Sequence, residues 1–294
     1  MARRRKSLKR FLRMVISELL ASRIFSDKAS IKLKYRFLMK RKLNLKEPKT
    51  FNEKLNWIKL YYRKPIMTTM VDKYEVKKLV SNLIGEEYVI PSIAIYDKWD
   101  DIEFDKLEAP FVLKTTHSSG VIAVVKDKET FDYETTKKKF NKSLRQNYFY
   151  SCREWPYKNV KPRIIVEKFI KDSKEDNLPV YKFFCFNGEP YLVQTIKHDK
   201  TTYETIDYFD MDWKRLDLRQ NFNNSEVPLD RPNNFEEMKE LASKLSSGFP
   251  FVRVDLYSVD GKIYFSEFTF FSDAGYQRFY PDEWDLKLGE KIVL

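Results

Sequence analysis

Two carboxylates and an arginine near the end of the chain have the residue types and spacing for phosphate and metal chemistry. Alternating apolar residues predict two strands here, and Asp260-Gly261 between them is a strong hairpin signal. In such a hairpin Asp255 and Glu267 lie nearly opposite each other, where they repel unless a cation lies between them. With Arg253 two residues before Asp255, the pattern indicates Mg²⁺ ligands beside a phosphate-binding guanidinium. A hairpin whose polar face simply meets water has the same pattern, so the rest of the chain has to decide.

The elements that must position this hairpin can be read from the periodicity of the apolar residues. A capping box, Thr50 with Glu53, begins a helix, and Asn187-Gly188 predicts a type I′ hairpin. Further helices are expected at about 66–81, 132–146 and 234–247. Strands are expected at 88–96, 111–114, 121–125, 163–170, 180–186, 191–196, 203–209, 251–257 and 263–269. Helices, then a small β/α unit, then a mostly antiparallel sheet make an α+β fold.

The net charge of +12 is concentrated in the first 42 residues. Residues 1–42 hold fifteen Lys and Arg against Glu18 and Asp27, so this arm carries +13 and the remaining residues sum to −1. Apolar residues between Leu8 and Leu20 have helical spacing, with basic residues on the other side. Such a basic amphipathic helix suits an anionic membrane surface, and docking on the chain's own core is an equal alternative. Nucleic acid ranks third, because the arm lacks interleaved aromatics or a reader motif.

The composition excludes several classes of protein and site. With 294 residues, 43% of them hydrophobic and 16% aromatic, the chain is globular and can bury a substantial core. No apolar run approaches the roughly 18–20 residues that span a bilayer. Cys152 and Cys185 are too few for a disulfide framework, and two histidines make no zinc constellation. A reducing, cytoplasmic setting fits best.

Three further residues could do chemistry. Lys114 ends a strand before the small polar loop 115–120, whose backbone N–H groups can fold over phosphates. Glu167 interrupts the apolar strand 163–170, where its carboxylate can accept a hydrogen bond from an adenine amino group. Lys182 is a cation in an otherwise apolar strand, and it either extends to solvent or meets an anion in a cleft. Each of these alone also fits a solvated side chain.

Taken together, these residues resemble the ATP-grasp superfamily. The matching order is Lys73, Lys114, Glu167, Lys182, Arg253-x-Asp255 and Glu267-x-Thr269. More closely, residues 45–54, 71–74, 153–158 and 181–188 are similar to the TupA-like branch. That branch is linked to the synthesis of teichuronopeptide and other bacterial surface polysaccharides.

The resemblance implies ATP bound between two α+β subdomains, with one or two Mg²⁺ ions. The residues implied to bind its phosphates are Lys73, Lys114 and the loop residues Thr116, His117, Ser118, Ser119 and Gly120. Those implied to bind adenine are Glu167, Lys168, Phe169 and Ile170, with Asp172 or Glu175 at the ribose. Lys182 and Arg253 would face the transferring phosphoryl group, and the implied Mg²⁺ ligands are Asp255, Glu267 and Thr269. Many members have Asn where this chain has Thr269, whose shorter side chain offers a single oxygen to a second Mg²⁺.

The resemblance also implies a division of the chain into four parts. A basic amphipathic arm at 1–42 is followed by a helical region at 43–87. A small ATP-grasp subdomain with the phosphate loop is expected at 88–162, and its last residues, 147–162, look like a connecting loop. The large subdomain, with the antiparallel sheet and the Mg²⁺ site, is expected at 163–294.

The implied activity is that of an ADP-forming ligase, which phosphorylates a carboxylate and lets an amine attack the acyl phosphate to give an amide. The expected substrates are a carboxylate-bearing surface glycan, or its precursor, and an amino acid as the amine donor. Residues 1–25 would keep the enzyme on the inner face of a bacterial membrane. Two alternatives stay open: a phosphotransferase that acts on a glycan hydroxyl, and a non-catalytic module that binds membrane or nucleic acid.

Overall fold

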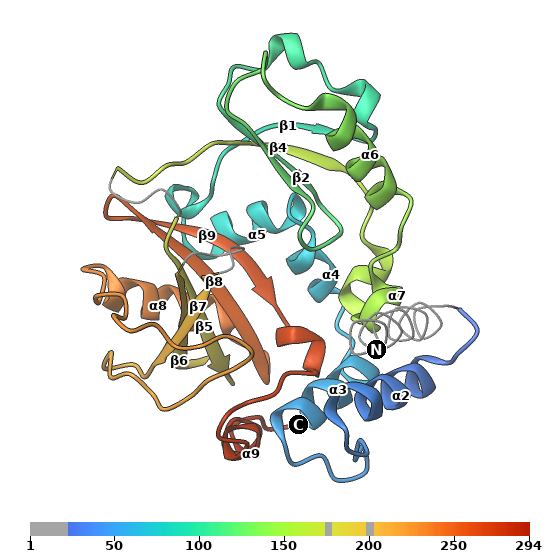
Figure 1. The fold of residues 1–294 in the computed structure, drawn as a ribbon, viewed down its shortest axis with the longest axis vertical. Helices are drawn as coiled ribbons and strands as arrows, with labels where there is room; N and C mark the ends of the chain where they lie inside the picture. Colours follow the sequence, from blue (N-terminus) through green and yellow to red (C-terminus); the bar gives the residue numbers. More distant parts are fainter. Residues whose placement is uncertain (1–22, 174–177, 198–202) are drawn as a thin grey trace, which may run out of the picture.

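The computed structural model describes residues 23–173, 178–197 and 203–294. These residues form two antiparallel sheets with helices packed around them, which confirms the expected α+β fold. Figure 1 shows the smaller sheet at the top and the larger one at the left, with helices α4 (Ile66–Val71) and α5 (Glu75–Ile84) between them. The helix expected between Leu8 and Leu20 lies outside the described residues.

The smaller sheet has the strand order β1-β4-β2-β3. Its strands are β1 (Ser92–Tyr96), β2 (Phe111–Thr115), β3 (Ile122–Val125) and β4 (Ile164–Lys168). Alternate residues of β2, Phe111 and Leu113, are fully buried and pack in one cluster with Phe140 of α6 (Tyr133–Leu144). Because side chains alternate along a strand, Lys114 is directed to the opposite face.

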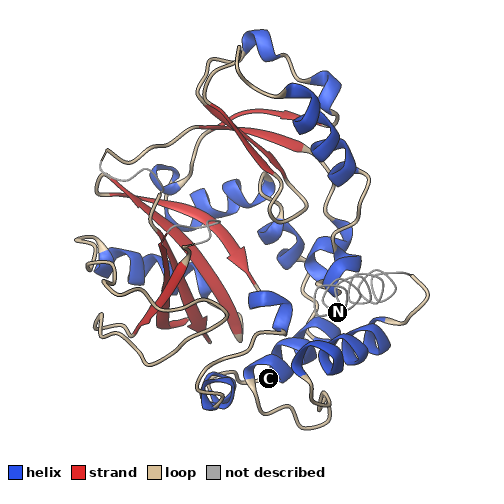
Figure 2. Cartoon of the chain, viewed as in Figure 1, coloured by secondary structure: helices blue, strands red, loops and turns tan. Residues whose placement is uncertain are grey.

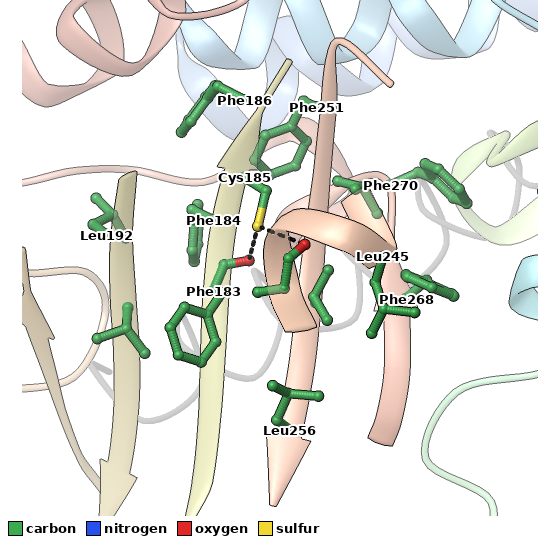
Figure 3. Close-up of a cluster of buried hydrophobic side chains, with 14 of the residues drawn as sticks. Phe183, Phe184, Cys185, Phe186, Leu192, Leu245, Phe251, Leu256, Phe268 and Phe270 are labelled. Carbon is green, nitrogen blue, oxygen red and sulfur yellow. Dashed lines mark hydrogen bonds between the residues drawn. The ribbon is translucent and has the colours of Figure 1, made fainter. Parts of the chain in front are cut away.

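The larger sheet has the strand order β7-β6-β5-β8-β9. Its strands are β5 (Val180–Phe186), β6 (Glu189–Lys197), β7 (Thr205–Phe209), β8 (Phe251–Val259) and β9 (Lys262–Thr269). One face packs on helix α8 (Phe235–Ser246), where the Phe183 and Phe235 rings stack with centroids 5.8 Å apart. Figure 3 shows this packing, with Cys185 directed at α8 and Leu245 among the aromatic rings. On the opposite face Phe184 and Phe186 pack on Phe51 of α3 (Phe51–Tyr61), and Lys182 lies on this face too.

Helices α2 (Asp27–Met39), α3 (Phe51–Tyr61) and α9 (Glu283–Glu290) lie in the lower part of the molecule (Figure 2). The other short elements are α7 (Phe149–Cys152) and the 3₁₀ turns η1 (Glu86–Tyr88), η2 (Trp99–Asp101), η3 (Phe104–Lys106), η4 (Trp155–Asn159) and η5 (Ser272–Gly275). The predicted capping box is present, since the Glu53 N–H donates to Thr50 Oγ1 at 3.3 Å and Glu53 Oε2 accepts from the Thr50 N–H at 3.2 Å. No helix in the described ranges has the length and apolar character needed to cross a membrane.

The single helix expected at 66–81 is wrong, because the chain breaks at Asp72. The Asp72 backbone is extended, with ψ 113°, and its Oδ1 accepts from the N–H groups of Tyr74 at 2.9 Å and Glu75 at 3.3 Å. An aspartate can satisfy the first N–H groups of a helix in this way, so it starts α5 instead of continuing α4. Lys73 therefore lies at a break between two helices.

Residues 147–162 are not the plain loop that the sequence suggested. Asn147 Oδ1 accepts from the Phe149 N–H at 3.1 Å and starts α7, which ends at Arg153 in a left-handed conformation with φ 58°. Pro156 then stands in the first turn of η4, where its missing N–H does no harm. This segment is a compact helical junction.

The expected strand at 163–170 ends at Lys168 and belongs to the smaller sheet, where β4 lies between β1 and β2. The expected boundary between the small subdomain, 88–162, and the large subdomain, 163–294, therefore separates β4 from the strands with which it pairs. Hydrogen bonds that bring distant segments together cannot be read from periodicity. The strand expected at 88–96 is also shorter, because Pro91 has no N–H to donate; its carbonyl accepts from the Lys168 N–H at 3.0 Å.

A β-bulge at Ser266 sets which side chains of β9 share a face. Asp255 pairs with Glu267, whereas the next residue, Leu256, pairs with Phe265, so Ser266 has no partner on β8. Phe265 and Phe268 are thereby brought together, with ring centroids 4.7 Å apart. Strict alternation would put Phe265 on the same face as Glu267, and the bulge breaks this alternation.

We expect Gly289→Ala to destabilise the fold by about 1–3 kcal/mol, because α9 packs tightly against the start of α3. A Cβ at Gly289 would lie 2.2 Å from the Lys49 carbonyl oxygen and 2.7 Å from the Phe51 nitrogen. Without that contact, alanine would stabilise a helix by about 1 kcal/mol relative to glycine. Urea unfolding measures the difference, with Glu290→Ala on the exposed side of α9 as the control. A more stable Gly289→Ala variant would contradict the close packing.

Candidate active site

A cavity of about 640 Å³ lies between the two sheets, with a wall formed by both sheets and by α5. This volume is within the range of about 300–1,000 Å³ that small-molecule sites occupy. The residues expected from the sequence that line it are Lys73, Lys114, Ser119, Gly120, Glu167, Lys182, Asp255 and Glu267. The expected residues that are not on its wall are Thr116, His117, Ser118, Lys168, Phe169, Ile170, Arg253 and Thr269.

Lys182, Asp255 and Glu267 form a row across three adjacent strands. The register pairs Lys182 of β5 with Asp255 of β8, and Asp255 with Glu267 of β9. Opposite residues of antiparallel strands share one face, so all three side chains meet the cavity. The Lys182 Nζ lies 3.8 Å from Asp255 Oδ2. The opposition of Asp255 and Glu267 that the hairpin pattern predicted is confirmed.

Arg253 holds Asp255 in a two-bond ion pair beside this row. Its Nε donates to Oδ1 and its Nη2 to Oδ2, each at 2.7 Å. The same Nη2 donates to Thr269 Oγ1 at 3.0 Å and lies 3.8 Å from Glu267 Oε1. Burial by itself lowers the pKa of the Arg253 guanidinium, but the charges of Asp255 and Glu267 outweigh it and raise that pKa. A permanently charged arginine therefore favours the ionised form of Glu267.

The Glu267 carboxylate is open to the cavity. Its side chain is 39% exposed, against 2% for Asp255. Burial raises the pKa of Glu267, but the positive charges of Lys73, Arg253 and Lys182 outweigh it and hold the pKa below its ordinary value. The acid is therefore ionised and accessible.

These two acids fit a magnesium ion that is completed by other ligands. Among the described residues, no three His, Cys, Asp or Glu side chains gather as a metal site. Mg²⁺, however, is usually held by one or two carboxylates together with phosphate oxygens and water. Both oxygens of Asp255 already accept from Arg253, so Glu267 is the more accessible ligand.

On the opposite wall Glu167 is shared by two lysines. The Lys114 Nζ lies 2.5 Å from Oε2, and the Lys77 Nζ lies 2.5 Å from Oε1. Burial raises the pKa of Glu167, but the two lysines outweigh it and lower that pKa. Lys77 lines the cavity and was not singled out from the sequence. Its only sequence signal is the four-residue spacing from Lys73, and a surface helix has many lysines with such spacing.

Lys73 fixes the loop that follows Lys114. Its Nζ donates to the Ser118 carbonyl at 2.6 Å, and its backbone N–H donates to the Thr116 carbonyl at 3.2 Å. Burial lowers the pKa of Lys73, and the negative charge of Glu267 opposes this effect. The lysine at the α4–α5 break thus connects the loop of the smaller sheet to the acids of the larger one.

Three polar side chains of the loop hold it to the rest of the smaller subdomain. Thr116 Oγ1 donates to the Lys161 carbonyl at 3.1 Å, and Ser118 Oγ shares a hydrogen bond of 2.6 Å with Thr115 Oγ1. His117 Nε2 lies 2.9 Å from the Ser143 carbonyl of α6. All three side chains are buried. They shape the loop, and Ser119 with Gly120 is the part that meets the cavity.

Part of the cavity lining is apolar. The apolar residues in it include Val76, Val89, Ile90, Leu178, Pro179, Val180, Ile196 and Leu229. The Lys168 N–H, which follows Glu167, is taken by the Pro91 carbonyl. Asp172 Oδ2 accepts from the Asp260 N–H at 3.0 Å and so ties this segment to the β8–β9 turn. Glu175 lies outside the described residues.

Three comparisons with known proteins were made. The family model described as TupA-like ATPgrasp matches residues 53–293. The D-alanine–D-alanine ligase of Bacillus anthracis is similar with a TM-score of 0.39 and 22% identity, over 68% of this chain and 57% of that chain. The D-alanine–D-alanine ligase of Helicobacter pylori is similar with a TM-score of 0.44 and 16% identity, over 83% of this chain and 69% of that chain. The ATP-grasp ligase PsnB is similar with a TM-score of 0.41 and 9% identity, over 74% of this chain and 59% of that chain. A comparison with curated proteins gave no match.

We expect Arg253→Met to reduce the free energy of unfolding by about 3–5 kcal/mol, because it leaves the buried Asp255 carboxylate without its partner. Asp255→Leu should reduce the free energy of unfolding by a similar amount, since it leaves the buried Arg253 guanidinium without its partner. The double variant should recover much of the loss, because two apolar side chains replace the pair.

Urea unfolding of the four proteins measures the coupling between Arg253 and Asp255. The exposed pair Lys287–Glu283, whose Nζ and Oε1 are 2.5 Å apart, is the matched control and should show little coupling. Losses that simply add in the Arg253/Asp255 double variant would show that the two residues are energetically independent.

Proposed function

We propose that this chain, which belongs to the TupA-like ATP-grasp family, is an ATP-dependent ligase that joins a carboxylate to an amine. One observation carries the proposal: a single cavity brings together lysines from α5, β2, β5 and β6 and carboxylates from β4, β8 and β9. Phosphoryl transfer needs positioning and charge stabilisation more than a side-chain nucleophile, and such a set of charges supplies both.

In this proposal the triphosphate is bound by Lys73, Lys114 and Lys182, whose side chains share the cavity wall. The loop end adds backbone donors at Ser119 and Gly120. A Cβ placed on Gly120 would meet no atom within 4 Å, so there is room for phosphate oxygens above the loop. The arrangement therefore fits a nucleoside triphosphate.

The adenine ring would lie against the apolar part of the cavity lining. Val76 of α5 and Val180 and Ile196 of the larger sheet form walls from both sides, which suits a flat aromatic base. Glu167 also lines the cavity. Because both its oxygens already meet lysines, its first task in this proposal is to align Lys114 and Lys77.

Asp255 and Glu267 would hold Mg²⁺, which supplies neutralisation of the phosphate charge when it is bound. Arg253 and Lys182 would stabilise the negative charge that develops on the transferring phosphoryl group. Arg253 is fixed by its bonds to Asp255 and Thr269, so little reorganisation is needed during the reaction.

For the substrates we propose a uronic-acid-like carboxylate of a surface glycan, or of its precursor, and an amino acid as the amine donor. The support is the link of the TupA-like branch with surface-polysaccharide synthesis. Residues 1–25, which are strongly basic, would retain the enzyme at the inner face of the membrane.

Lys114→Ala should weaken ATP binding about 10- to 100-fold, because it removes one charge-assisted hydrogen bond worth about 1.5–3 kcal/mol. Isothermal titration calorimetry with ATP and Mg²⁺ measures the change. Lys138→Ala, at an exposed position of α6, is the matched control and should bind as the wild type does. Equal ATP affinity of the Lys114 and Lys138 variants would contradict the assignment of Lys114 to the phosphate site.

Glu267→Gln should lower Mg²⁺-dependent turnover at least about tenfold and shift the Mg²⁺ titration to higher concentration, since an amide is a poorer Mg²⁺ ligand than a carboxylate. Release of ADP is followed with candidate carboxylates and amines present. Superimposable Mg²⁺ titrations of variant and wild type would argue against the metal assignment.

The product distinguishes a ligase from a phosphotransferase. A ligase gives an amide, ADP and inorganic phosphate, and only when an amine is present. Mass spectrometry of the products makes the distinction, and a stable phosphate ester formed without an amine would replace the ligase assignment by a kinase.

A further inference from the structure

Helix α2 has a stripe of cations on its outward side. Lys28, Lys32 and Arg36 are spaced by four residues, so their side chains follow one side of the helix, and all three are exposed. Among the described residues, none of the three forms an ion pair or a side-chain hydrogen bond. The acid that begins the helix, Asp27, pairs instead with Arg63 at 3.1 Å. The charges of the stripe are therefore available to a partner.

Apolar side chains run beside this stripe. Leu33 and Phe37 are also four residues apart, each one position after a member of the stripe. Leu33 is 45% exposed and Phe37 is half-buried. The Lys40 Nζ, just after the helix, lies 4.8 Å from the Phe37 ring centroid. The outward face of α2 thus presents cations and apolar groups side by side.

The inner side of α2 fixes the helix to the rest of the fold. Its buried apolar residues pack in one cluster with the residue Leu43 that follows the helix; they are Ile31, Tyr35 and Met39. The Lys34 Nζ donates to the Ser151 carbonyl at 2.6 Å. After the helix, Arg41 pairs with Asp282 at 3.0 Å. These contacts set the orientation of α2, so its outward face is held in a defined position.

This face is separate from the candidate active site. No described residue of α2 lines the cavity. Figure 1 shows α2 at the lower right, whereas the two sheets that enclose the cavity lie at the top and at the left. A partner on the outward face of α2 would therefore leave the cavity open to substrates.

The chemistry of the face fits an anionic lipid bilayer. Basic residues are attracted to anionic headgroups, and apolar side chains beside them enter the interface. A helix of 13 residues is about 20 Å long, so the three cations and Leu33 can meet a flat surface together. Residues 23–50 hold ten Lys and Arg against Asp27 and Glu47, so the surrounding segment favours the same partner. A polynucleotide would attract the cations but has no use for the exposed leucine.

We propose that the outward face of α2, formed by Lys28, Lys32, Leu33, Arg36 and Phe37, binds an anionic membrane surface. The inference does not depend on the ligase assignment, because the face lies outside the cavity. It goes beyond the contact proposed for residues 1–25, since it assigns a helix that is packed on the fold. Such a contact would determine how the whole enzyme is oriented on the bilayer.

Vesicle binding by the full chain tests the proposal. The protein is titrated with vesicles of phosphatidylcholine alone and with equimolar vesicles of phosphatidylcholine and phosphatidylglycerol, and the bound fraction is measured by sedimentation. We expect binding to the anionic vesicles that weakens as salt is added, and little binding to the neutral ones. No binding of the wild type to the anionic vesicles would overturn the proposal.

The triple variant Lys28→Gln/Lys32→Gln/Arg36→Gln isolates the stripe. A basic residue near an anionic surface is worth about fivefold in affinity, so this variant should bind the anionic vesicles about 100-fold more weakly than the wild type. Unchanged affinity would assign the membrane contact to other parts of the chain, residues 1–25 included, and would overturn the role of α2.

A matched variant removes the same charges from another helix. Lys138→Gln/Lys142→Gln/Arg145→Gln changes two lysines and one arginine at exposed positions of α6 and just after it. Because these charges lie on another element, the loss of affinity should be less than about fivefold. Equal losses in the two triple variants would show that only net charge matters, and that result would contradict a defined docking face.

A substitution at Leu33 distinguishes a membrane from a nucleic acid. Leu33→Ser should weaken vesicle binding about fivefold, because an apolar side chain no longer enters the interface. Leu83→Ser is the control, since Leu83 of α5 is 49% exposed and should not contact the bilayer. The same proteins are titrated with a double-stranded oligonucleotide. If the α2 triple variant loses oligonucleotide binding and keeps vesicle binding, the face belongs to nucleic acid and the membrane proposal is wrong.

Discussion

The positive charges of the cavity can lie close together only because carboxylates are buried among them. On one wall Glu167 neutralises Lys114 and Lys77, each at 2.5 Å, and on the other Asp255 is bound twice by Arg253 at 2.7 Å. At such distances and low exposure, an uncompensated charge would be strongly destabilising. The result is a set of cations that is aligned before any ligand arrives, which is the arrangement that stabilises developing charge with little reorganisation.

Local irregularities of the backbone direct two of the charged side chains toward the cavity. The break at Asp72 releases Lys73 from the helix and lets it reach the Ser118 carbonyl. The bulge at Ser266 directs Glu267 to the cavity while the neighbouring aromatic side chains stay in the core. Both features interrupt regular hydrogen bonding, and both stand beside the cavity. Regular helices and strands support the site, and the interruptions determine where the Lys73 and Glu267 side chains point.

The helical junction joins the two sheets at the far end of the site. Lys59 of α3 bonds to the Cys152 carbonyl in the junction and to the Ala274 carbonyl beside β9. Because Arg253 also reaches Ser272 in the same turn, one buried lysine connects the junction, the turn and the arginine. This explains why residues far apart in the chain form a continuous environment from the junction to Arg253.

The sequence by itself determined the α+β fold and the pairing of Asp255 with Glu267, because these follow from local periodicity and from a strong turn signal. It also indicated the family, through the resemblance of several short strings of residues to the TupA-like branch. It could not identify Lys77, whose importance comes only from Glu167 on a strand of another element. It also assigned His117 to the phosphates, whereas tertiary contacts turn its ring to the Ser143 carbonyl. Side-chain alternation is a short-range property, while charge pairing, burial and the register between distant segments are set when the whole chain packs. Only the tertiary structure could therefore decide which lysines and acids meet in one cavity.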